Sequence, residues 1–139
     1  MRLRLPLALA VLLASPAAAD EVWSGDWGRI VWETDLGITA VLRADGSAGI
    51  APRRLYVEGL TLDSAGRRTS YDGIWTAAFG DGGCALSLVD PISAQPTPYW
   101  GTFRLTFVGR AFPSAWAGVW GECTDIPLNA FGAEPVQGE

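Results

Sequence analysis

Residues 99–123 read YWGTFRLTFVGRAFPSAWAGVWGEC and carry three of the seven tryptophans of the chain. Large apolar side chains occupy most odd positions from 99 to 107, the period of two that is typical of a strand with one face on a core. A second strand is expected at 115–123, after the loop 109–114. Symmetric closure of that loop pairs Phe107 with Trp116 and Phe103 with Trp120. A slip of one residue would separate these aromatic side chains onto opposite faces, so the pattern favours this register.

This register sorts the aromatic residues into two groups. On the expected core face lie Phe103, Phe107, Trp116 and Trp120, and a preceding strand is expected to contribute Trp75. On the opposite face, Trp100 and Arg104 alternate with threonines. An indole on a mixed polar face indicates a contact residue rather than a core residue, so we predict Trp100 and Arg104 as candidate contact residues.

Short strand patterns separated by turns precede this hairpin. The Asp45-Gly46 pair is a typical hairpin turn and predicts Val41 opposite Ile50. The hairpin before it predicts Ile30 opposite Val41. The segment 53–62 suits either a strand that is irregular at Gly59 or a short helical turn, and we favour the strand.

The next strand is expected at 69–79. The four-residue loop 80–83 would then pair Phe79 with Cys84 and Trp75 with Leu88, so that the following residues form the neighbouring strand. Three prolines make 90–98 a crossing loop. The pattern as a whole predicts an all-β fold, a small antiparallel meander barrel of seven or eight strands, with a β-sandwich as the alternative.

The first nineteen residues have the three parts of a secretory signal peptide. Two arginines precede the apolar run 5–14, and Ala17-Ala18-Ala19 offers a cleavage site before Asp20. The run is too short to span a bilayer. We therefore expect a signal peptide at 1–19, a single β domain at 20–126 and a flexible C-terminal tail at 127–139. The expected location is the bacterial periplasm or the exterior, reached by the general secretory route.

The charge of the chain restricts the partners it can bind, and its cysteine count indicates the compartment. The part after residue 19 has eight arginines against fifteen acids, a formal charge of −7, and the chain has no lysine. An acidic surface without a basic run predicts no nucleic-acid partner and, after signal cleavage, no membrane partner. The two cysteines, Cys84 and Cys123, are expected to form one disulfide in an oxidising compartment.

The residues that catalysis usually employs are scarce. The chain has no histidine, which removes the commonest general base and metal ligand, so we expect no cofactor, no metal and no enzyme. Carboxylates acting alone, as in glycoside hydrolysis, remain an alternative. The pairs to consider are Asp26 with Glu33 and Glu122 with Asp125.

Two non-enzymatic functions fit the tryptophan content. A barrel lined with indoles binds a small apolar or aromatic ligand, and this is the function we expect. The alternative is a protein-binding barrel. Gly73-Ile74-Trp75 followed by Cys84-Ala85-Leu86-Ser87-Leu88 resembles the opening of small bacterial periplasmic protease-inhibitor barrels, in which a Gly-x-Trp strand precedes a disulfide cysteine on the next strand. The same Gly-x-Trp also opens strands in lipocalin and avidin barrels. The resemblance implies a barrel with a protease as one possible partner.

Overall fold

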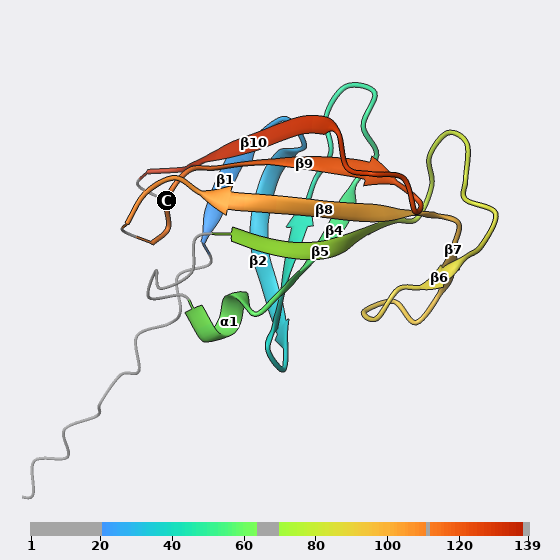
Figure 1. Cartoon of the computed structure of the whole chain (residues 1–139), viewed down its shortest axis with the longest axis horizontal. Helices are drawn as coiled ribbons and strands as arrows, with labels where there is room; N and C mark the ends of the chain where they lie inside the picture. The colour runs from blue at the N-terminus through green and yellow to red at the C-terminus, as the bar shows by residue number, and fades with distance from the viewer. Residues whose placement is uncertain (1–20, 64–69, 111, 138–139) are drawn as a thin grey trace, which may run out of the picture.

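Eight antiparallel strands close into a barrel in the computed structural model (Figure 1). Around the barrel the order is β1-β10-β9-β8-β5-β4-β3-β2, and a separate two-stranded ribbon, β6-β7, is inserted between β5 and β8. All barrel strands therefore pair with their neighbours along the chain, and β1 pairs with β10 to close the wall. This confirms the predicted antiparallel meander barrel.

The structure describes residues 21–63, 70–110 and 112–137. The expected signal peptide, residues 1–19, lies outside this range. No helix in these three segments is long and apolar enough to cross a bilayer. The elements are β1 (Val22–Gly25), β2 (Gly28–Leu36), β3 (Thr39–Ala44), β4 (Arg53–Glu58), α1 (Leu60–Asp63), β5 (Ser70–Ala77), β6 (Leu88–Val89), β7 (Pro96–Thr97), β8 (Tyr99–Phe107), β9 (Trp116–Glu122) and β10 (Asn129–Pro135).

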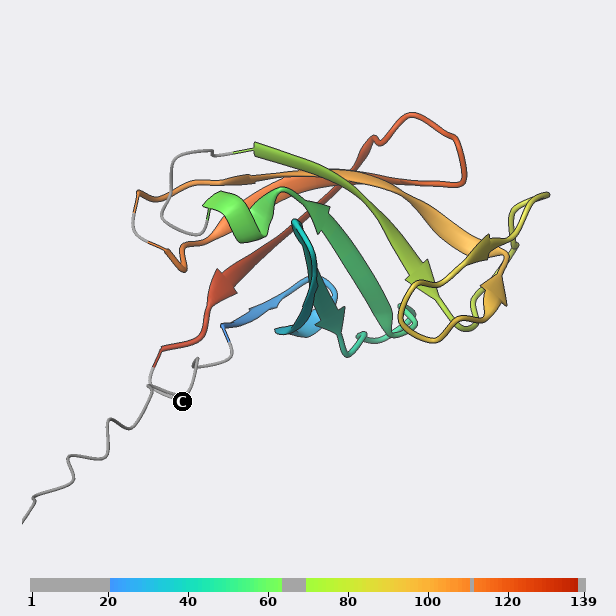
Figure 2. The same cartoon turned by 90° about the horizontal axis from the view of Figure 1, so that it is seen from below.

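The two ends of the barrel differ. Figures 1 and 2 place α1, the start of β1 and the end of β10 at one end, and the β6-β7 ribbon at the other. We call these the α1 end and the ribbon end. The ribbon end also carries the β1-β2 turn, the β3-β4 loop at 45–52 and the β9-β10 loop at 123–128.

Large aromatic side chains fill the middle of the barrel and its α1 end. Two glycines on inward-facing positions make room for them. A Cβ on Gly73 would lie 2.6 Å from the ring of Phe103, and one on Gly101 would lie 2.7 Å from the indole nitrogen of Trp75. Such contacts are far too short, so these glycines are needed where the rings cross the barrel. The buried aromatic residues of this core are Trp23, Trp27, Tyr71, Trp75, Phe103, Phe107, Trp116 and Phe131. Tyr56 is also buried, but it lies on the outer face of β4.

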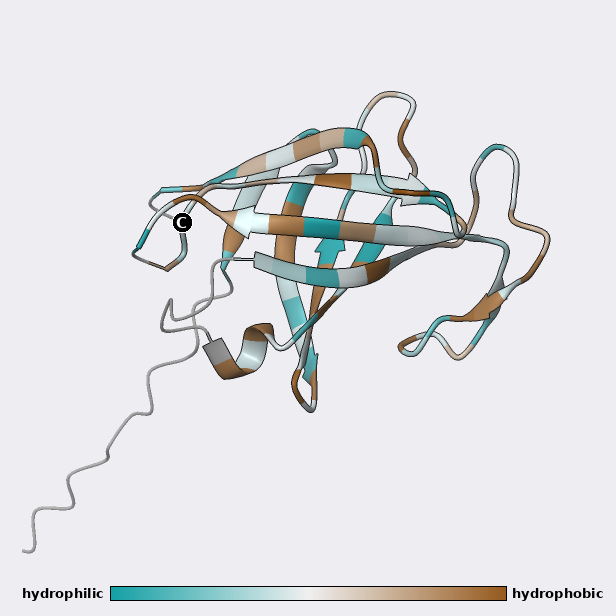
Figure 3. Ribbon diagram, viewed as in Figure 1, coloured by the Kyte–Doolittle hydropathy of each residue, from teal (hydrophilic) through white to brown (hydrophobic). Residues whose placement is uncertain are grey.

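The register predicted for the aromatic hairpin is confirmed. Phe103 pairs with Trp120 and Phe107 with Trp116 across β8 and β9. Of the five predicted core aromatics, Trp75, Phe103, Phe107 and Trp116 are buried, and Trp120 is partly buried and packs against the core. In Figure 3, β8 alternates between apolar and polar residues along its length.

The registers predicted for β2, β3 and β4 were wrong. Ile30 pairs with Ala44 rather than with Val41, because β2 continues to Leu36 and the chain turns at 37–38 instead of at 34–37. An irregularity between Trp32 and Thr34 also shifts the β2-β3 ladder by one residue. Such a bulge adds a residue to one strand without an obvious mark in the sequence.

The Asp45-Gly46 pair does not form a two-residue hairpin. Its backbone amides donate to the carbonyl oxygens of Arg29 and Trp27, so it continues the β2-β3 pairing instead of turning. The turn toward β4 comes later, in the loop 45–52, and Val41 faces Tyr56 rather than Ile50. Gly46 does have the positive φ expected of this position, +85°.

Both alternatives considered for 53–62 occur, one after the other. Arg53–Glu58 form strand β4, and a one-turn helix, α1, begins at Leu60. Gly59, with φ +85°, separates them. A left-handed residue is what allows the chain to leave the strand and enter the helix within one position.

The segment after β5 does not return as the neighbouring strand. β5 pairs with β8, so Trp75 faces Gly101 and not Leu88. Phe79 and Leu86, expected on an apolar strand face, are 61% and 74% exposed. The intervening residues leave the barrel and form the β6-β7 ribbon. Cys84 accordingly lies in a loop, not on a strand as the inhibitor resemblance implied.

The expected tail at 127–139 was also wrong for its central part. Asn129–Pro135 form β10, which pairs with both β9 and β1 and completes the barrel. Phe131 and Ala133 face the core. The boundary placed at residue 126 therefore cuts the domain. This strand contains one glycine, one proline and one large apolar residue. Its alternation of apolar and polar side chains is therefore too weak to be recognised from the sequence.

Candidate binding cup at the ribbon end

An open cavity of about 930 Å³ lies at the ribbon end of the barrel. We call it the cup. It is bounded by the loop 45–52, the start of β4, the end of β5 with the loop that follows it, the start of β8 and the end of β9. Its aromatic lining residues are Trp75, Phe79, Tyr99, Trp100 and Trp120, and its charged ones are Asp45, Arg53, Asp81 and Glu122.

Arg53 is the one basic residue of the cup. It is the first residue of β4 and lies in phase with the buried Leu55 and Val57, so its side chain belongs to the inward-facing set. Its cross-strand neighbour in β5 is Ala77. The small side chain of Ala77 leaves space for the guanidinium to extend across the barrel mouth.

The guanidinium of Arg53 lies against three indoles. Its central carbon is 4.1 Å from the ring centroid of Trp75, 4.5 Å from that of Trp27 and 4.8 Å from that of Trp120. We call these three rings the indole cage. Contacts of a cation with a ring face contribute about 2 kcal/mol when they are shielded from water.

The indole cage comes from three separate parts of the chain. Its centroids are 6.2 Å apart for Trp27 and Trp75, 5.5 Å for Trp27 and Trp120, and 5.9 Å for Trp75 and Trp120, all in edge-to-face arrangements. Trp75 Nε1 also donates to the carbonyl oxygen of Gly121, at 3.0 Å. Edge-to-face packing leaves some ring faces available, and Arg53 occupies them.

Two of the three guanidinium nitrogens of Arg53, Nε and Nη1, are buried without a hydrogen-bond partner. Indole faces attract a cation but offer no lone pair. Burial lowers the pKa of Arg53 from its usual value, and the negative charge of Glu122 partly offsets that effect. Because a guanidinium stays protonated at any physiological pH, the cup holds a permanent, under-coordinated positive charge.

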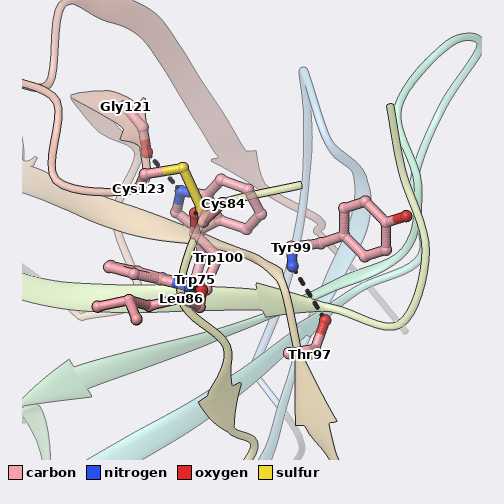
Figure 4. The surroundings of a disulfide bond; sticks show 8 residues. All are labelled: Trp75, Cys84, Leu86, Thr97, Tyr99, Trp100, Gly121 and Cys123. Atoms are coloured by element: carbon pink, nitrogen blue, oxygen red, sulfur yellow. Dashed lines mark hydrogen bonds between the residues drawn. A yellow bond between two sulfur atoms is a disulfide. The ribbon is translucent and has the colours of Figure 1, made fainter. Parts of the chain in front are cut away.

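The disulfide predicted between Cys84 and Cys123 is present and borders the cup (Figure 4). It joins the loop after β5 to the residue after β9. Backbone bonds support it: Cys123 N donates to the carbonyl oxygen of Trp100, and Cys84 N to that of Pro98. The disulfide therefore holds one side of the cup in place.

Trp100 occupies the outer face of β8, as predicted, and lines the side of the cup next to the disulfide. Its Nε1 donates to the carbonyl oxygen of Leu86, at 2.8 Å (Figure 4). The side chain is half-buried. It thus holds the exposed loop against the barrel and at the same time presents ring surface to the cavity.

Arg104, the second candidate contact residue, lies away from the cup. It forms a two-point ion pair with Asp72 on the outer wall, at 2.6 Å and 2.9 Å. That contact raises the pKa of Arg104 and lowers the pKa of Asp72. The structure does not bring Arg104 together with Trp100 in a common cavity.

Asp90 anchors the ribbon to the barrel wall. Its carboxylate accepts hydrogen bonds from the hydroxyl of Thr76 and from the backbone amides of Ile92 and Ser93, and Arg54 Nη1 lies 3.7 Å away. Burial alone would raise the pKa of Asp90, but these hydrogen bonds outweigh it and hold the pKa below its usual value. The ionised form of Asp90 is therefore the one that makes these contacts between the ribbon and the barrel wall.

The carboxylate pairs considered for glycoside hydrolysis have other contacts. Asp26 Oδ2 accepts from Gly132 N, and Glu33 pairs with Arg54 at 2.9 Å. Glu122 lines the cup, whereas Asp125 does not. In the part of the chain that the structure describes, no group of three or more His, Cys, Asp or Glu residues could hold a metal ion.

Arg53 distinguishes this site, and it was not among the site residues predicted from the sequence. Its phase with Leu55 and Val57 was the available signal, because a period of two places all three on one face. An arginine at the start of a strand, beside a second arginine, is ordinarily solvated, so the local pattern alone does not indicate an enclosed guanidinium.

Comparisons with protein-family models, curated proteins and solved structures give no significant match for this chain.

Proposed function

We propose that this protein is a non-enzymatic barrel of the periplasm or the cell exterior that binds a small aromatic ligand in the cup. The observation that carries the proposal is the cup itself. Its volume of about 930 Å³ lies in the range of small-molecule sites. Its lining combines aromatic faces with a few polar groups, the usual composition of such a site.

The location of the cup refines the expectation drawn from the tryptophans. The middle of the barrel is occupied by its own side chains, so the ligand would lie at the ribbon end and not deep within the interior. There it would contact Tyr99 and Trp120 from the barrel and Trp100 from the disulfide side. The disulfide is consistent with export, since such bonds persist in oxidising compartments.

Fluorescent probe binding tests the proposal. N-phenyl-1-naphthylamine, an uncharged aromatic probe, should bind the purified protein with a rise in probe fluorescence. Tyr99→Ala should weaken that binding at least tenfold, because Tyr99 is half-buried and lines the cup. The matched control is Trp32→Ala, which removes a half-buried aromatic residue outside the cup. Absence of saturable binding, or equal loss in both variants, would contradict the proposal.

A protein partner is the second candidate function, and one observation favours it. The loops around the cup expose apolar side chains that are 61–79% accessible: Phe79, Leu86, Val89, Ile126 and Leu128. Figure 3 shows apolar residues along the outlying ribbon. Exposed apolar groups close together on a small domain are typical of interaction surfaces. The α1 end also exposes apolar residues, with Leu62 at 71% and Val108 at 68%, so the argument for the ribbon end rests on its nearness to the cup.

The two candidates respond to different substitutions. The double variant Ile126→Ser with Leu128→Ser should abolish stoichiometric inhibition of a secreted protease, with subtilisin as the probe, and leave naphthylamine binding unchanged. If the small-ligand function is correct, Tyr99→Ala should weaken naphthylamine binding and leave protease inhibition unchanged. Lack of any inhibition by the wild-type protein would count against this protease-inhibitor form of the second candidate.

A further inference from the structure

Arg53 is set apart from the arginines on the outer wall of the barrel. Arg54 pairs with Glu33, and Arg104 pairs with Asp72. Arg53 forms no ion pair with any residue that the structure describes, and its Nε and Nη1 are buried without partners. A buried guanidinium without an acceptor is costly, and proteins rarely keep one without a use.

The indole cage does not complete the coordination of Arg53. Three ring faces hold the guanidinium in position by attraction to its charge, but hydrogen bonds need an in-plane acceptor. The third nitrogen, Nη2, is not among the buried unpaired atoms. Since Arg53 lines the cup, this edge of the guanidinium is the one a ligand can reach first.

The surrounding charges set a limit on what the cup accepts. Asp81 and Glu122 line it together with Asp45, which forms an ion pair with Arg43 at 3.4 Å. Glu122 also acts on Arg53 through its charge. A ligand with several negative charges would be repelled by these carboxylates, whereas a single acidic group placed at Arg53 would gain a charge-assisted hydrogen bond.

From this geometry we propose that the cup selects aromatic monoanions, with Arg53 receiving a carboxylate or sulfonate while the aromatic part of the ligand stacks against Tyr99 and Trp120. The inference rests on the proposed small-ligand function and adds to it the chemical class of the ligand. A planar guanidinium already fixed by three rings binds an acid with little loss of side-chain freedom, which favours affinity.

Matched pairs of probes that differ in one charge test the inference. Calorimetric titration should give at least tenfold tighter binding of indole-3-acetate than of indole-3-acetamide. The pair 8-anilinonaphthalene-1-sulfonate and N-phenyl-1-naphthylamine should show the same preference by fluorescence. Arg53→Met should remove the preference in both pairs while the two neutral probes still bind, which shows that the cup is intact.

Two further variants separate hydrogen bonding from net charge. Arg53→Lys keeps the charge but lacks the planar guanidinium that the three indoles hold in place, so it should retain only part of the preference. Glu122→Gln should strengthen binding of the acids severalfold and leave the neutral probes unchanged. Arg110→Met is the control, because it removes an exposed arginine from the β8-β9 loop at the α1 end. It should change the binding of neither the acids nor the neutral probes.

The outcomes distinguish the inference from the function on which it rests. If none of the four probes binds the wild-type protein, both fail. If the neutral and acidic members of each pair bind equally, or if Arg53→Met and Arg53→Lys leave the preference unchanged, the inference is overturned and the small-ligand function stands. If Arg53→Met does not fold, the results with Arg53→Lys and Glu122→Gln decide in the same way.

Discussion

Substitution of Phe131 by alanine tests whether the C-terminal strand closes the barrel. The ring is 4% exposed and packs against Trp27 and Trp116, with centroid distances of 4.7 Å and 4.9 Å. The register of β10 is held by Asp26, whose amide and carboxylate bond the backbone of Gly132. Phe131 thus connects the last strand to Trp27 of the indole cage and to the core.

The magnitude follows from the buried area. An aromatic side chain buries about 150–250 Å², which corresponds to about 4–6 kcal/mol at about 25 cal/mol per Å². Alanine retains part of that area, and deletions of buried phenylalanine cost about 3–5 kcal/mol. A domain of this size has a free energy of unfolding of about 5–15 kcal/mol. Phe131→Ala should therefore remove a large part of the stability.

Urea unfolding followed by tryptophan fluorescence and circular dichroism measures the effect. With a slope of about 2 kcal/mol per M, the midpoint should fall by about 2 M. Leu128→Ala is the control, because Leu128 is 79% exposed just before the same strand, and its effect should stay within about 0.5 kcal/mol. If Phe131→Ala lowers the free energy of unfolding by less than about 1 kcal/mol, the reasoning is refuted and β10 does not contribute to the core as described.

Three further predictions concern the disulfide, the carboxylate of Asp90 and the exposed Arg104. Replacing Cys84 and Cys123 by serine removes a cross-link across 39 positions, which should lower the free energy of unfolding by about 4 kcal/mol in calorimetry; an unchanged melting temperature would oppose this. The pKa of Asp90 is lowered on folding, so its contribution is complete above its unfolded pKa of about 3.9 and is lost as the pH falls through the folded value. Asp90→Asn should consequently flatten the acid limb of a stability-against-pH curve, and an unchanged limb would argue against the anchor. Arg104→Ala should leave the urea midpoint within error, because its pair with Asp72 is solvent-exposed; a clear drop would show a structural role.

Local patterns in the sequence were sufficient to predict the β8-β9 hairpin. The alternation through 99–107 and the symmetric loop after it determine the β8-β9 register, because neighbouring strands joined by a short loop have few ways to pair. The same reasoning failed at Asp45-Gly46, where a strong turn pair continues a ladder instead. It failed there because backbone bonds to Arg29 of β2 and to Trp27 of the β1-β2 turn compete with the turn.

The candidate site was beyond local reasoning. Trp75 and Trp120 were recognisable as inward-facing aromatic residues, and the pair Cys84 and Cys123 was recognisable as a disulfide from the cysteine count alone. The position of Arg53 against the indole rings was not recognisable, because it depends on closure of the barrel. Closure brings together Arg53 from β4, Trp75 from β5, Trp120 from β9 and Trp27 from the β1-β2 turn.

What the sequence by itself determined is the alternation of β8, its register with β9 and the pairing of the two cysteines, since these depend on near neighbours or on composition. Only the tertiary structure decided that β10 completes the wall and that Arg53 is enclosed by Trp27, Trp75 and Trp120. The physical reason is barrel closure. Inward side chains from distant parts of the chain then share one interior, as Trp27 and Phe131 do. There the space left by the glycines and Ala77, rather than any local preference, determines which side chain faces the cup.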